Sequence, residues 1–360
     1  MTQATIPTCI PASATLGLDL GDDRTEFCLL DPNGDVLERG GVATTRAALT
    51  KCFRALSPCL VVMEVCGQSA WISRLAEEHG HRTLVADSRR IALIARGKSK
   101  FDERDAELLA RLGRSDCGLL NPIRHKSEQV QADREVLTAR RVLVEVRTKL
   151  INHVRQVVKL FGCRIPACSP ESIHKRALEH VPDCLQRTLK PFVGQIESLT
   201  GQIRSYDKEI ARLARQDYRD SAQLEQVGGV GDLIATAYIL TIVDPSRFRR
   251  SRQVGAYLGM TPGKRQSGKS DPQLRITKCG DRELRRLLVI AANHILGRGP
   301  DCDLRRYGEK IAARGGKNAR RRAKVAVARK LAVLLHRLWV TGEVYDPFRQ
   351  AKLRGEPIPA

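Results

Sequence analysis

The pattern of apolar and polar positions divides the chain into three parts, and the spacing of the apolar residues differs from one part to the next. Between residues 15 and 115, short apolar runs alternate with helical stretches near 45–57 and 68–79. The expected strands are TLGLDL, EFCLLD, VLERGGVA, CLVVMEV and RTLVAD, with DPNGD as a hairpin turn. Three meandering strands followed by helix, strand, helix and strand predict a mixed sheet with helices on both faces.

A seven-residue repeat marks the middle of the chain. It runs through Val130, Leu137, Val144, Ile151 and Val158. After a Pro-containing break at 166–182, apolar residues recur at spacings of four and three from Leu185 to Leu213. This pattern predicts a coiled-coil helical region over residues 125–215. A heptad pattern shows that a helix packs against another helix, but not whether that helix belongs to the same chain. An intramolecular antiparallel hairpin and an oligomerisation device therefore remain equal alternatives.

The last part, from residue 221 to 345, is helical, rich in small residues and basic. QLEQVGGVGDLIATAYILTIV places glycines between two helical runs, which predicts a helix-hairpin-helix element. Gly229 and Gly231 would let the backbone approach a phosphate, and amides at the start of the next helix would bind it. A plain turn explains such glycines about as often. We therefore expect an all-α basic C-terminal domain in which this element contacts DNA.

Charge is concentrated in this last part. The 360 residues carry a formal net charge of +22, yet residues 1–115 hold 15 Lys and Arg against 15 Asp and Glu. Residues 247–340 hold 25 against 6. Such a local excess favours a polyanion, so nucleic acid is the expected partner. Within KNARRRAKVAVARK, the candidate contacts are Arg320, Arg321 and Arg322, with a solvated helix face as the alternative.

Hydrophobic content of 42% is ordinary for a globular protein, and no apolar run approaches the roughly 20 residues of a membrane span. The first residues, MTQATIPTCIPASAT, lack the basic-then-apolar pattern of a signal peptide. We therefore expect a cytoplasmic protein without a membrane partner.

Four carboxylates are expected to converge in the first domain. In a sheet of ribonuclease H-like strand order, Asp19 lies on the central strand, Glu64 closes the strand CLVVMEV, and Asp102 and Asp105 share one helix face. Clustered carboxylates are tolerated chiefly when cations neutralise them, and oxygen ligands suit Mg²⁺ or Mn²⁺. Two such ions would support phosphodiester cleavage.

Each of these acids also has an ordinary explanation. Asp102 and Asp105 are suited to a helix N-terminus, Glu64 to a strand end, and Asp19 to a hydrogen bond with a nearby turn. The element types and their order, taken together, favour the metal site. The nearby acids that could replace members of the set are Asp22, Asp23, Glu103 and Glu107.

Several segments together resemble a known family. GLDLG, VVMEVCG, KSKFDERDAELLAR, VGGVGDLIATAYILTIVDPSRFRRSRQVGAYLGMTP, QSGKS and RITKCGDRELRRLLVIAA follow one another along the chain. This order is similar to that in insertion-sequence transposases with a DEDD, RuvC-like N-terminal domain, among them the bridge-RNA-guided recombinases. KSKFDERDAELLAR stands in place of the family's Lys-Thr-Asp-x-x-Asp-Ala pattern. The resemblance covers most of the chain.

The resemblance implies three domains. They are a RuvC-like DEDD catalytic domain at 12–118, a coiled-coil region at 125–215, and a C-terminal helical transposase domain at 221–345 that carries a serine nucleophile. It also implies composite active sites, in which the acidic cluster of one subunit meets the serine of another. The implied assembly is a homo-oligomer, a dimer or tetramer, that holds donor and target DNA and a guide (bridge) RNA.

The Ser267-Gly268 step in MTPGKRQSGKSD matches the family's serine motif, so the resemblance assigns the nucleophile to Ser267. Ser270 remains an alternative, because two neighbouring positions depart from the family pattern. The flanking cations expected to orient a phosphate are Lys264, Arg265 and Lys269. Without the resemblance, a serine in a basic, glycine-rich loop is more often a turn residue.

Three other functions compete with a DNA transposase or recombinase. GLDLG also resembles the first phosphate loop of sugar kinases and actin-like ATPases, but their second Asp-x-Gly loop is missing from the sequence. A metal-dependent nuclease of the Holliday-junction resolvase type would use the acidic cluster without the serine. A non-enzymatic DNA-binding protein would need only the basic region, and four clustered carboxylates without metal would hinder its binding.

Overall fold

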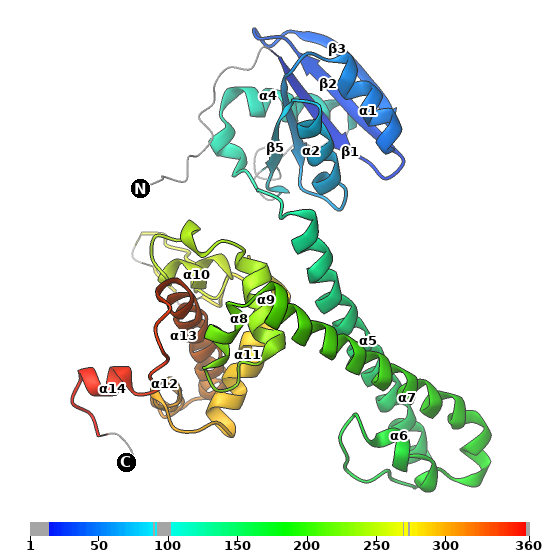
Figure 1. Cartoon of the computed structure of the whole chain (residues 1–360), viewed down its shortest axis with the longest axis vertical. Coiled ribbons are helices and arrows are strands. Elements are labelled where there is room, and N and C mark those ends of the chain that lie inside the picture. Colours follow the sequence, from blue (N-terminus) through cyan, green and yellow to red (C-terminus); the bar gives the residue numbers. More distant parts are fainter. Residues whose placement is uncertain (1–13, 89–90, 92–101, 269, 273, 358–360) are drawn as a thin grey trace. The chain divides into compact units, whose positions relative to one another are not determined.

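The computed structural model describes residues 14–88, 91, 102–268, 270–272 and 274–357, with the backbone alone at 102 and 103. The chain divides into two compact units, Met1–Ser127 and Glu128–Ala360 (Figure 1). In the described part of the chain, no helix combines the length and the apolar character needed to cross a bilayer.

The first unit is built on a five-stranded sheet with the order β3-β2-β1-β4-β5. The strands are β1 (Thr15–Leu20), β2 (Arg24–Leu30), β3 (Val36–Ala43), β4 (Leu60–Glu64) and β5 (Arg82–Ala86). β1 pairs antiparallel with β2 and parallel with β4, while β2–β3 is antiparallel and β4–β5 parallel. The mixed α/β sheet expected from the sequence is confirmed, and its order is consistent with a ribonuclease H-like domain.

Helices cover both faces of this sheet. Odd-numbered and even-numbered positions of the central strands face opposite sides, because side chains alternate along a strand. Leu16 and Leu18 are buried against α1 (Arg46–Ala55) and α2 (Ser69–Glu78). The other face is covered by α4 (Asp102–Ser115), whose Ala106 is buried against β2. A short helix η1 (Cys117–Leu120) follows α4.

Two long helices open the second unit, α5 (Glu128–Leu160) and α7 (Asp183–Arg212), joined through α6 (Ile173–Arg176) and η2 (Leu178–His180). They pack against each other as a hairpin (Figure 1). Val154, Val158 and Ile196 have no exposed surface and belong to one cluster. The predicted helical stripe is therefore covered, at these positions, by the same chain.

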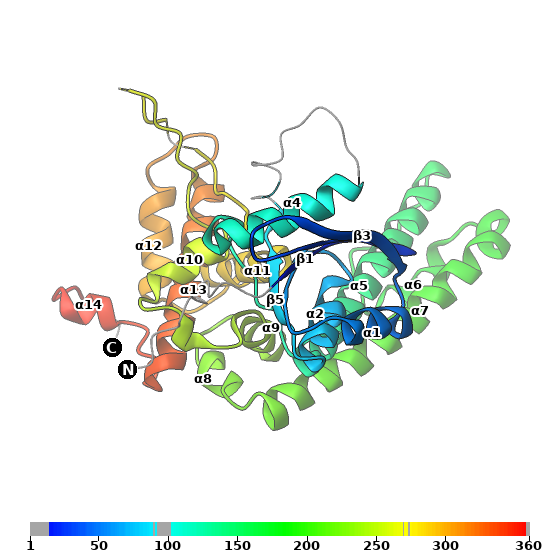
Figure 2. The same cartoon turned by 90° about the horizontal axis from the view of Figure 1, so that it is seen from above.

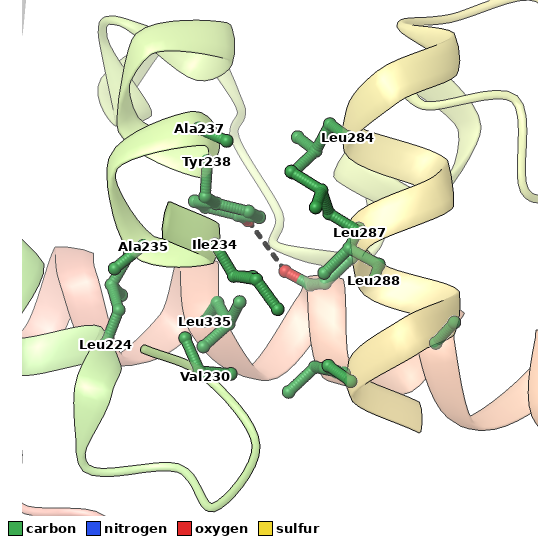
Figure 3. Packing of buried hydrophobic residues seen from close by; sticks show 14 of the residues in the cluster. Leu224, Val230, Ile234, Ala235, Ala237, Tyr238, Leu284, Leu287, Leu288 and Leu335 are labelled. Carbon is green, nitrogen blue, oxygen red and sulfur yellow. Dashed lines mark hydrogen bonds between the residues drawn. The ribbon is translucent and has the colours of Figure 1, made fainter. Parts of the chain in front are cut away.

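The remaining helices form a second core around α9. They are η3 (Leu213–Asp217), α8 (Ser221–Glu225), α9 (Asp232–Ile242), η4 (Pro245–Arg247), α10 (Arg252–Tyr257), α11 (Arg282–Gly297), α12 (Asp303–Ala312), α13 (Ala319–Thr341) and α14 (Arg349–Leu353). The Tyr238 hydroxyl in α9 donates a 2.7 Å hydrogen bond to the Ala332 carbonyl of α13 (Figure 3). Leu137 of α5 and Ile210 of α7 are buried in this same core, so the long helices belong to this unit.

Candidate active site and nucleic-acid interface

Asp19 and Glu64 lie side by side at the carboxyl ends of adjacent parallel strands. β1 and β4 stay in register up to the residue before each acid. A Cβ added at Gly17 would meet α4, so this face of β1 is the one that α4 covers. Asp19, two residues further on, faces the same side, and so does Glu64, two residues after Val62, which also contacts α4. Both acids are half-buried.

The direction of α4 places its first turn at the same end of the sheet. Two arginines near the end of α4 donate hydrogen bonds to carbonyl oxygens of the β2–β3 turn. These bonds join Arg111 Nη1 to Gly34 O at 3.2 Å and Arg114 Nη2 to Pro32 O at 2.7 Å. That turn lies beyond the start of β1, because Thr15 pairs with Leu30. The first turn of α4, with Asp102 and Asp105, therefore lies over the end of β1 that carries Asp19.

Of the alternative acids, Glu107 has a structural role. Its carboxylate accepts hydrogen bonds from Arg111 at 2.8 Å and from Arg39 of β3 at 2.6 Å. These bonds, with Arg111 the larger contributor, hold the pKa of Glu107 below its ordinary value. Glu107 thus fastens α4 to the sheet. Asp22 and Asp23 are exposed in the turn after β1, and the side chain of Glu103 lies outside the described residues.

Glu26 is a neighbour of the acidic end that the sequence did not reveal. It pairs with Asp19 across the antiparallel β1–β2 ladder, so both side chains face α4. Its carboxylate forms an ion pair with Arg24 at 2.6 Å. The sequence could have indicated that Glu26 lies beside Asp19, because the short turn between β1 and β2 sets the register of the two strands.

The carboxylate oxygens at this end of the sheet are ligands of the kind that a hard divalent cation binds. Asp19 and Glu64 offer carboxylate oxygens from neighbouring strands, which Mg²⁺ and Mn²⁺ accept. Across the described side chains, no three Asp, Glu, His or Cys residues are arranged to hold an ion. The side chain of Asp102 lies outside that description. Asp105 is half-buried in the first turns of α4.

Ser267 and Ser270 lie opposite each other at the tip of a two-stranded ribbon, called here the serine hairpin (residues 259–268, 270–272 and 274–278). Ser267 N donates to Ser270 O at 3.1 Å, and Ser270 N donates to Ser267 O at 3.0 Å. Gly268 between them has φ +54°, a value that favours glycine. Directly paired residues of an antiparallel ribbon face the same side, so both exposed serines present their hydroxyls together.

Two cations precede Ser267 on its strand of the ribbon. Lys264 and Arg265 are exposed, whereas Lys269 lies outside the described residues. Figure 2 shows the ribbon extending away from α10 and α11 within its own unit.

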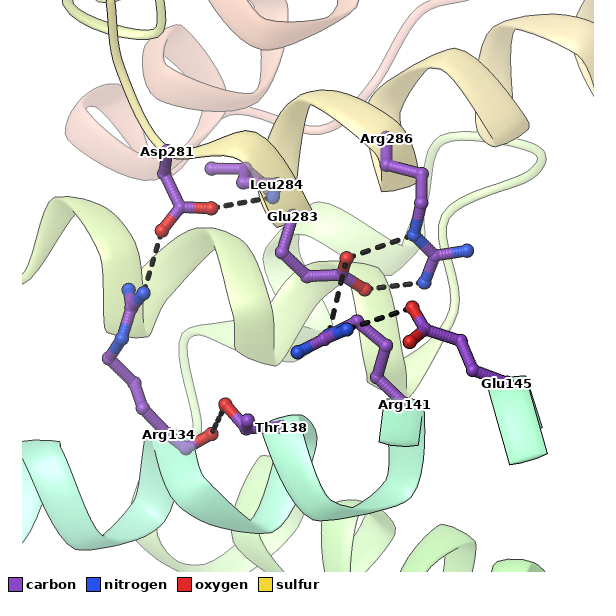
Figure 4. A network of polar contacts seen from close by, with 8 residues as sticks. All are labelled: Arg134, Thr138, Arg141, Glu145, Asp281, Glu283, Leu284 and Arg286. Carbon is purple, nitrogen blue, oxygen red and sulfur yellow. Dashed lines mark hydrogen bonds and ion pairs between the residues drawn. The ribbon is translucent and has the colours of Figure 1, made fainter. Parts of the chain in front are cut away.

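The base of the serine hairpin is held closely. A Cβ at Gly259 would lie 2.3 Å from Cys279 N, so only glycine permits this approach. Arg285 donates to the carbonyl oxygens of Leu258 and Gly280 at 3.0 and 2.6 Å. Asp281 caps α11 and forms a 2.6 Å ion pair with Arg134 of α5 (Figure 4). The ribbon therefore rises from a rigid base.

The glycine turn before α9 does not have the geometry expected of a phosphate-binding turn. Gly229 has φ +88°, and a Cβ there would lie 3.1 Å from the ring of His294, so packing against α11 accounts for this glycine. Gly231 precedes α9 with open space around it. Burial, together with neighbouring Asp232, raises the pKa of Glu225. A phosphate at Gly231 would therefore meet two carboxylates.

The first turn of α13 is exposed and basic. Arg320, Arg321 and Arg322 all face solvent. Arg322 donates to the Gly315 carbonyl at 3.2 Å, which orders one of the three guanidinium groups.

Two family models match the chain. The model described as "Transposase IS116/IS110/IS902 family" matches residues 221–307, and one described as "Transposase" with a DEDD domain matches residues 16–162.

Curated relatives agree with these matches. A "Probable family 20 transposase" of Pseudomonas aeruginosa is 30% identical over 78% of this chain and 83% of its own length. The "Transposase for insertion sequence element IS1111A" of Coxiella burnetii is 26% identical over 92% of this chain and 90% of its own. The "Transposase for insertion sequence element IS1328" of Yersinia enterocolitica is 26% identical over 79% and 84%. The chain belongs to the IS110-type family of insertion-sequence transposases.

Proposed function

We propose that this transposase cuts and rejoins DNA strands with an acidic metal site in its first unit and a serine nucleophile in its second. The observation that carries the proposal is the adjacency of Asp19 and Glu64 on the face covered by α4, with the first turn of α4 at the same end. Asp102 and Asp105 complete the proposed metal-binding set.

The residues Asp19, Glu64, Asp102 and Asp105 would hold Mg²⁺ or Mn²⁺. When bound, such ions stabilise the charge that develops on phosphate oxygens in strand cleavage. The protein's contribution is to hold the carboxylates in place, and the contacts of Glu107 with Arg39 and Arg111 fix the helix that carries two of them.

The serine step conserves the phosphodiester bond energy. Ser267 Oγ attacks the phosphorus, loses its proton, and forms a serine–phosphate ester, while the displaced sugar oxygen leaves and takes up a proton. A hydroxyl of the second strand then attacks the same phosphorus, restores a phosphodiester and returns the proton to serine. No external energy source is needed. Lys264, Arg265 and Lys269 would orient the phosphate.

Guide RNA and self-assembly are part of this proposal and are supported by the family resemblance. A dimer or tetramer would bring the serine of one subunit to the acidic site of another. Donor and target DNA would be bound by the basic second unit, including Arg320–Arg322. Sequencing the nucleic acid that co-purifies with the protein tests the RNA part, since a single short structured RNA is expected and random fragments contradict it.

The chemistry is tested by trapping a protein–DNA adduct with denaturant in Mg²⁺. Asp19→Ala and Glu64→Ala are each expected to abolish cleavage while leaving DNA binding intact. Because the two serines face the same side, Ser267→Ala, Ser270→Ala and the double variant are compared by gel and mass spectrometry. An adduct that persists in Ser267→Ala but is lost in Ser270→Ala would show that Ser270 is the nucleophile.

Hydrolysed ends without an adduct, from active wild-type enzyme, would contradict the serine step and favour a resolvase-type nuclease. Near wild-type cleavage by both acidic variants would contradict the metal site.

A further inference from the structure

A group of arginines around α10 forms no close ion pair with the described residues. Arg249, Arg250 and Arg252 are exposed and, like Arg247 and Arg329, form no ion pair with any residue that the structure describes. Several other arginines of this unit have an acidic partner, for example Arg286 with Glu283, Arg305 with Glu309, Arg306 with Asp301 and Arg349 with Glu343. Arg247 acts on one acid, Asp244, whose pKa is lowered by hydrogen bonds from Ser246 and also by the charge of Arg247. The charges of Arg249, Arg250, Arg252 and Arg329 are not balanced by an ion pair with any described residue.

Arg252 and Arg329 lie on one surface, and Arg249 and Arg250 come directly before Arg252 along the chain. Arg329 of α13 lies against the bare backbone of Gly255 in α10, where an added Cβ would be 3.2 Å from its Cγ. Gly255 is three residues after Arg252, on the same helix face. The guanidinium of Arg247 lies 4.8 Å from the ring centre of Tyr257, also in α10. Tyr257 is five residues after Arg252 and so lies on the other side of α10. We therefore leave Arg247 out and call Arg249, Arg250, Arg252 and Arg329 the arginine surface.

The segment that carries the arginine surface is fastened to α13. His336 is 1% exposed, and its ring nitrogens lie 3.0 Å from Ser251 Oγ and 2.9 Å from the Pro245 carbonyl oxygen. Phe248 packs edge-on against the same ring at 5.5 Å between centroids. The backbone of the arginine-rich turn is therefore held in one place, which lowers the entropy cost of binding a ligand there.

We propose that the arginine surface binds the phosphodiester backbone of a DNA duplex and holds it beside the serine hairpin. α10 ends at Tyr257, two residues before this hairpin begins at Gly259, whose carbonyl accepts a hydrogen bond from Lys278 N at 2.9 Å. Arg322 stands two helical turns before Arg329 on α13, about 10 Å away at roughly 1.5 Å rise per residue. This span corresponds to about three steps of one strand at roughly 3.4 Å each.

Duplex DNA fits this surface better than a single strand. Single-stranded nucleic acid is held by aromatic rings on which its bases stack. Here the two nearby rings, Phe248 and Tyr257, are half-buried, and the guanidinium of Arg247 covers them. A surface of cations without an open aromatic platform contacts phosphates only, so it positions a duplex and reads no sequence.

The test removes three charges from the surface. Arg249→Gln, Arg250→Gln and Arg252→Gln are combined, and binding of a labelled random-sequence duplex is measured by anisotropy across KCl concentrations in EDTA. The slope of log K against log salt is expected to become less steep by about 2 to 3, at roughly 0.9 per lost phosphate contact. The matched control combines Arg349→Gln, Lys352→Gln and Arg354→Gln, which loses the same charge from residues paired with acids, and its slope should stay unchanged.

Further variants separate charge from folding. The corresponding triple lysine variant should restore the slope, because it restores the charge. An unchanged slope in the glutamine variant, or an equal change in the control, overturns the proposal. A loss confined to structured RNA, with duplex binding intact, overturns it in favour of an RNA surface. The inference rests on the proposed function. DNA binding measured in EDTA, however, does not depend on cleavage. If Asp19→Ala fails to affect cleavage, the proposed metal site is contradicted, and the salt dependence of DNA binding still tests the arginine surface.

Discussion

Replacing Gly17 by alanine tests whether α4 is seated directly on β1. The new Cβ would lie 2.0 Å from the Ala106 carbonyl oxygen and 2.7 Å from Ala110 N. Real Cβ atoms essentially never approach closer than 3.0 Å, so the helix has to retreat by about 1 Å. Overpacking of this kind costs about 1–3 kcal/mol. Because α4 carries Asp102 and Asp105, a displacement of about 1 Å is also expected to slow cleavage about 10²-fold.

Hydrogen exchange of the full chain measures the first effect locally. Peptides from β1 and α4 should lose protection in Gly17→Ala, whereas those from α5 and α7 should not, because they belong to the other unit. Gly194→Ala is the control, since its Cβ in α7 would meet no atom within 4 Å and should stabilise that helix by about 0.5–1 kcal/mol. Wild-type protection in α4 together with a wild-type cleavage rate would refute the close packing.

Two further predictions concern the second unit. Val243, at the end of α9, has φ +66°, which costs a β-branched residue about 1–2 kcal/mol, so Val243→Gly should raise the Tm by a few degrees in thermal unfolding, while glycine in place of the exposed Val340 of α13 should lower it. Burial and the neighbouring Asp232 raise the pKa of Glu225 in the folded state, so its ionisation opposes folding as pH rises. Glu225→Gln should therefore unfold at higher urea than wild type at pH 7, with the difference vanishing as pH falls below the ordinary value of 4.5; an equal difference at both pH values would contradict this.

The sheet was predictable from local pattern. All five expected strands are present, and α1 and α2 fall within the helical stretches expected near 45–57 and 68–79. The β2–β3 turn shows why, because Asp31 accepts hydrogen bonds from the backbone N–H groups of Asn33, Gly34 and Asp35. A turn made by its own side chain is visible in sequence. The same holds for Thr45, whose side chain caps α1.

The candidate site depends on contacts that local pattern does not contain. That Asp19 faces α4 follows from alternation once Gly17 is known to touch the helix. The role of Glu107 follows only from its contact with Arg39, 68 residues away. The placement of Ser267 opposite Ser270 depends on the two backbone hydrogen bonds between them, which no periodicity in the sequence predicts.

The long helices show what a heptad pattern can and cannot predict. It identifies the stripe that must be covered, and Ile196 and Ile203 on that stripe are 0% and 3% exposed within one chain. Arg147 lies in the same interface, 4% exposed, with its guanidinium 2.9 Å from Glu171 of the connecting segment. A charge at Ile196 would therefore disturb folding of the hairpin and would say nothing about self-association. Val142 and Val146, 43% and 38% exposed and one turn apart on α5, lie off the stripe, so a charge at these positions tests the proposed self-association without opening the chain's own core.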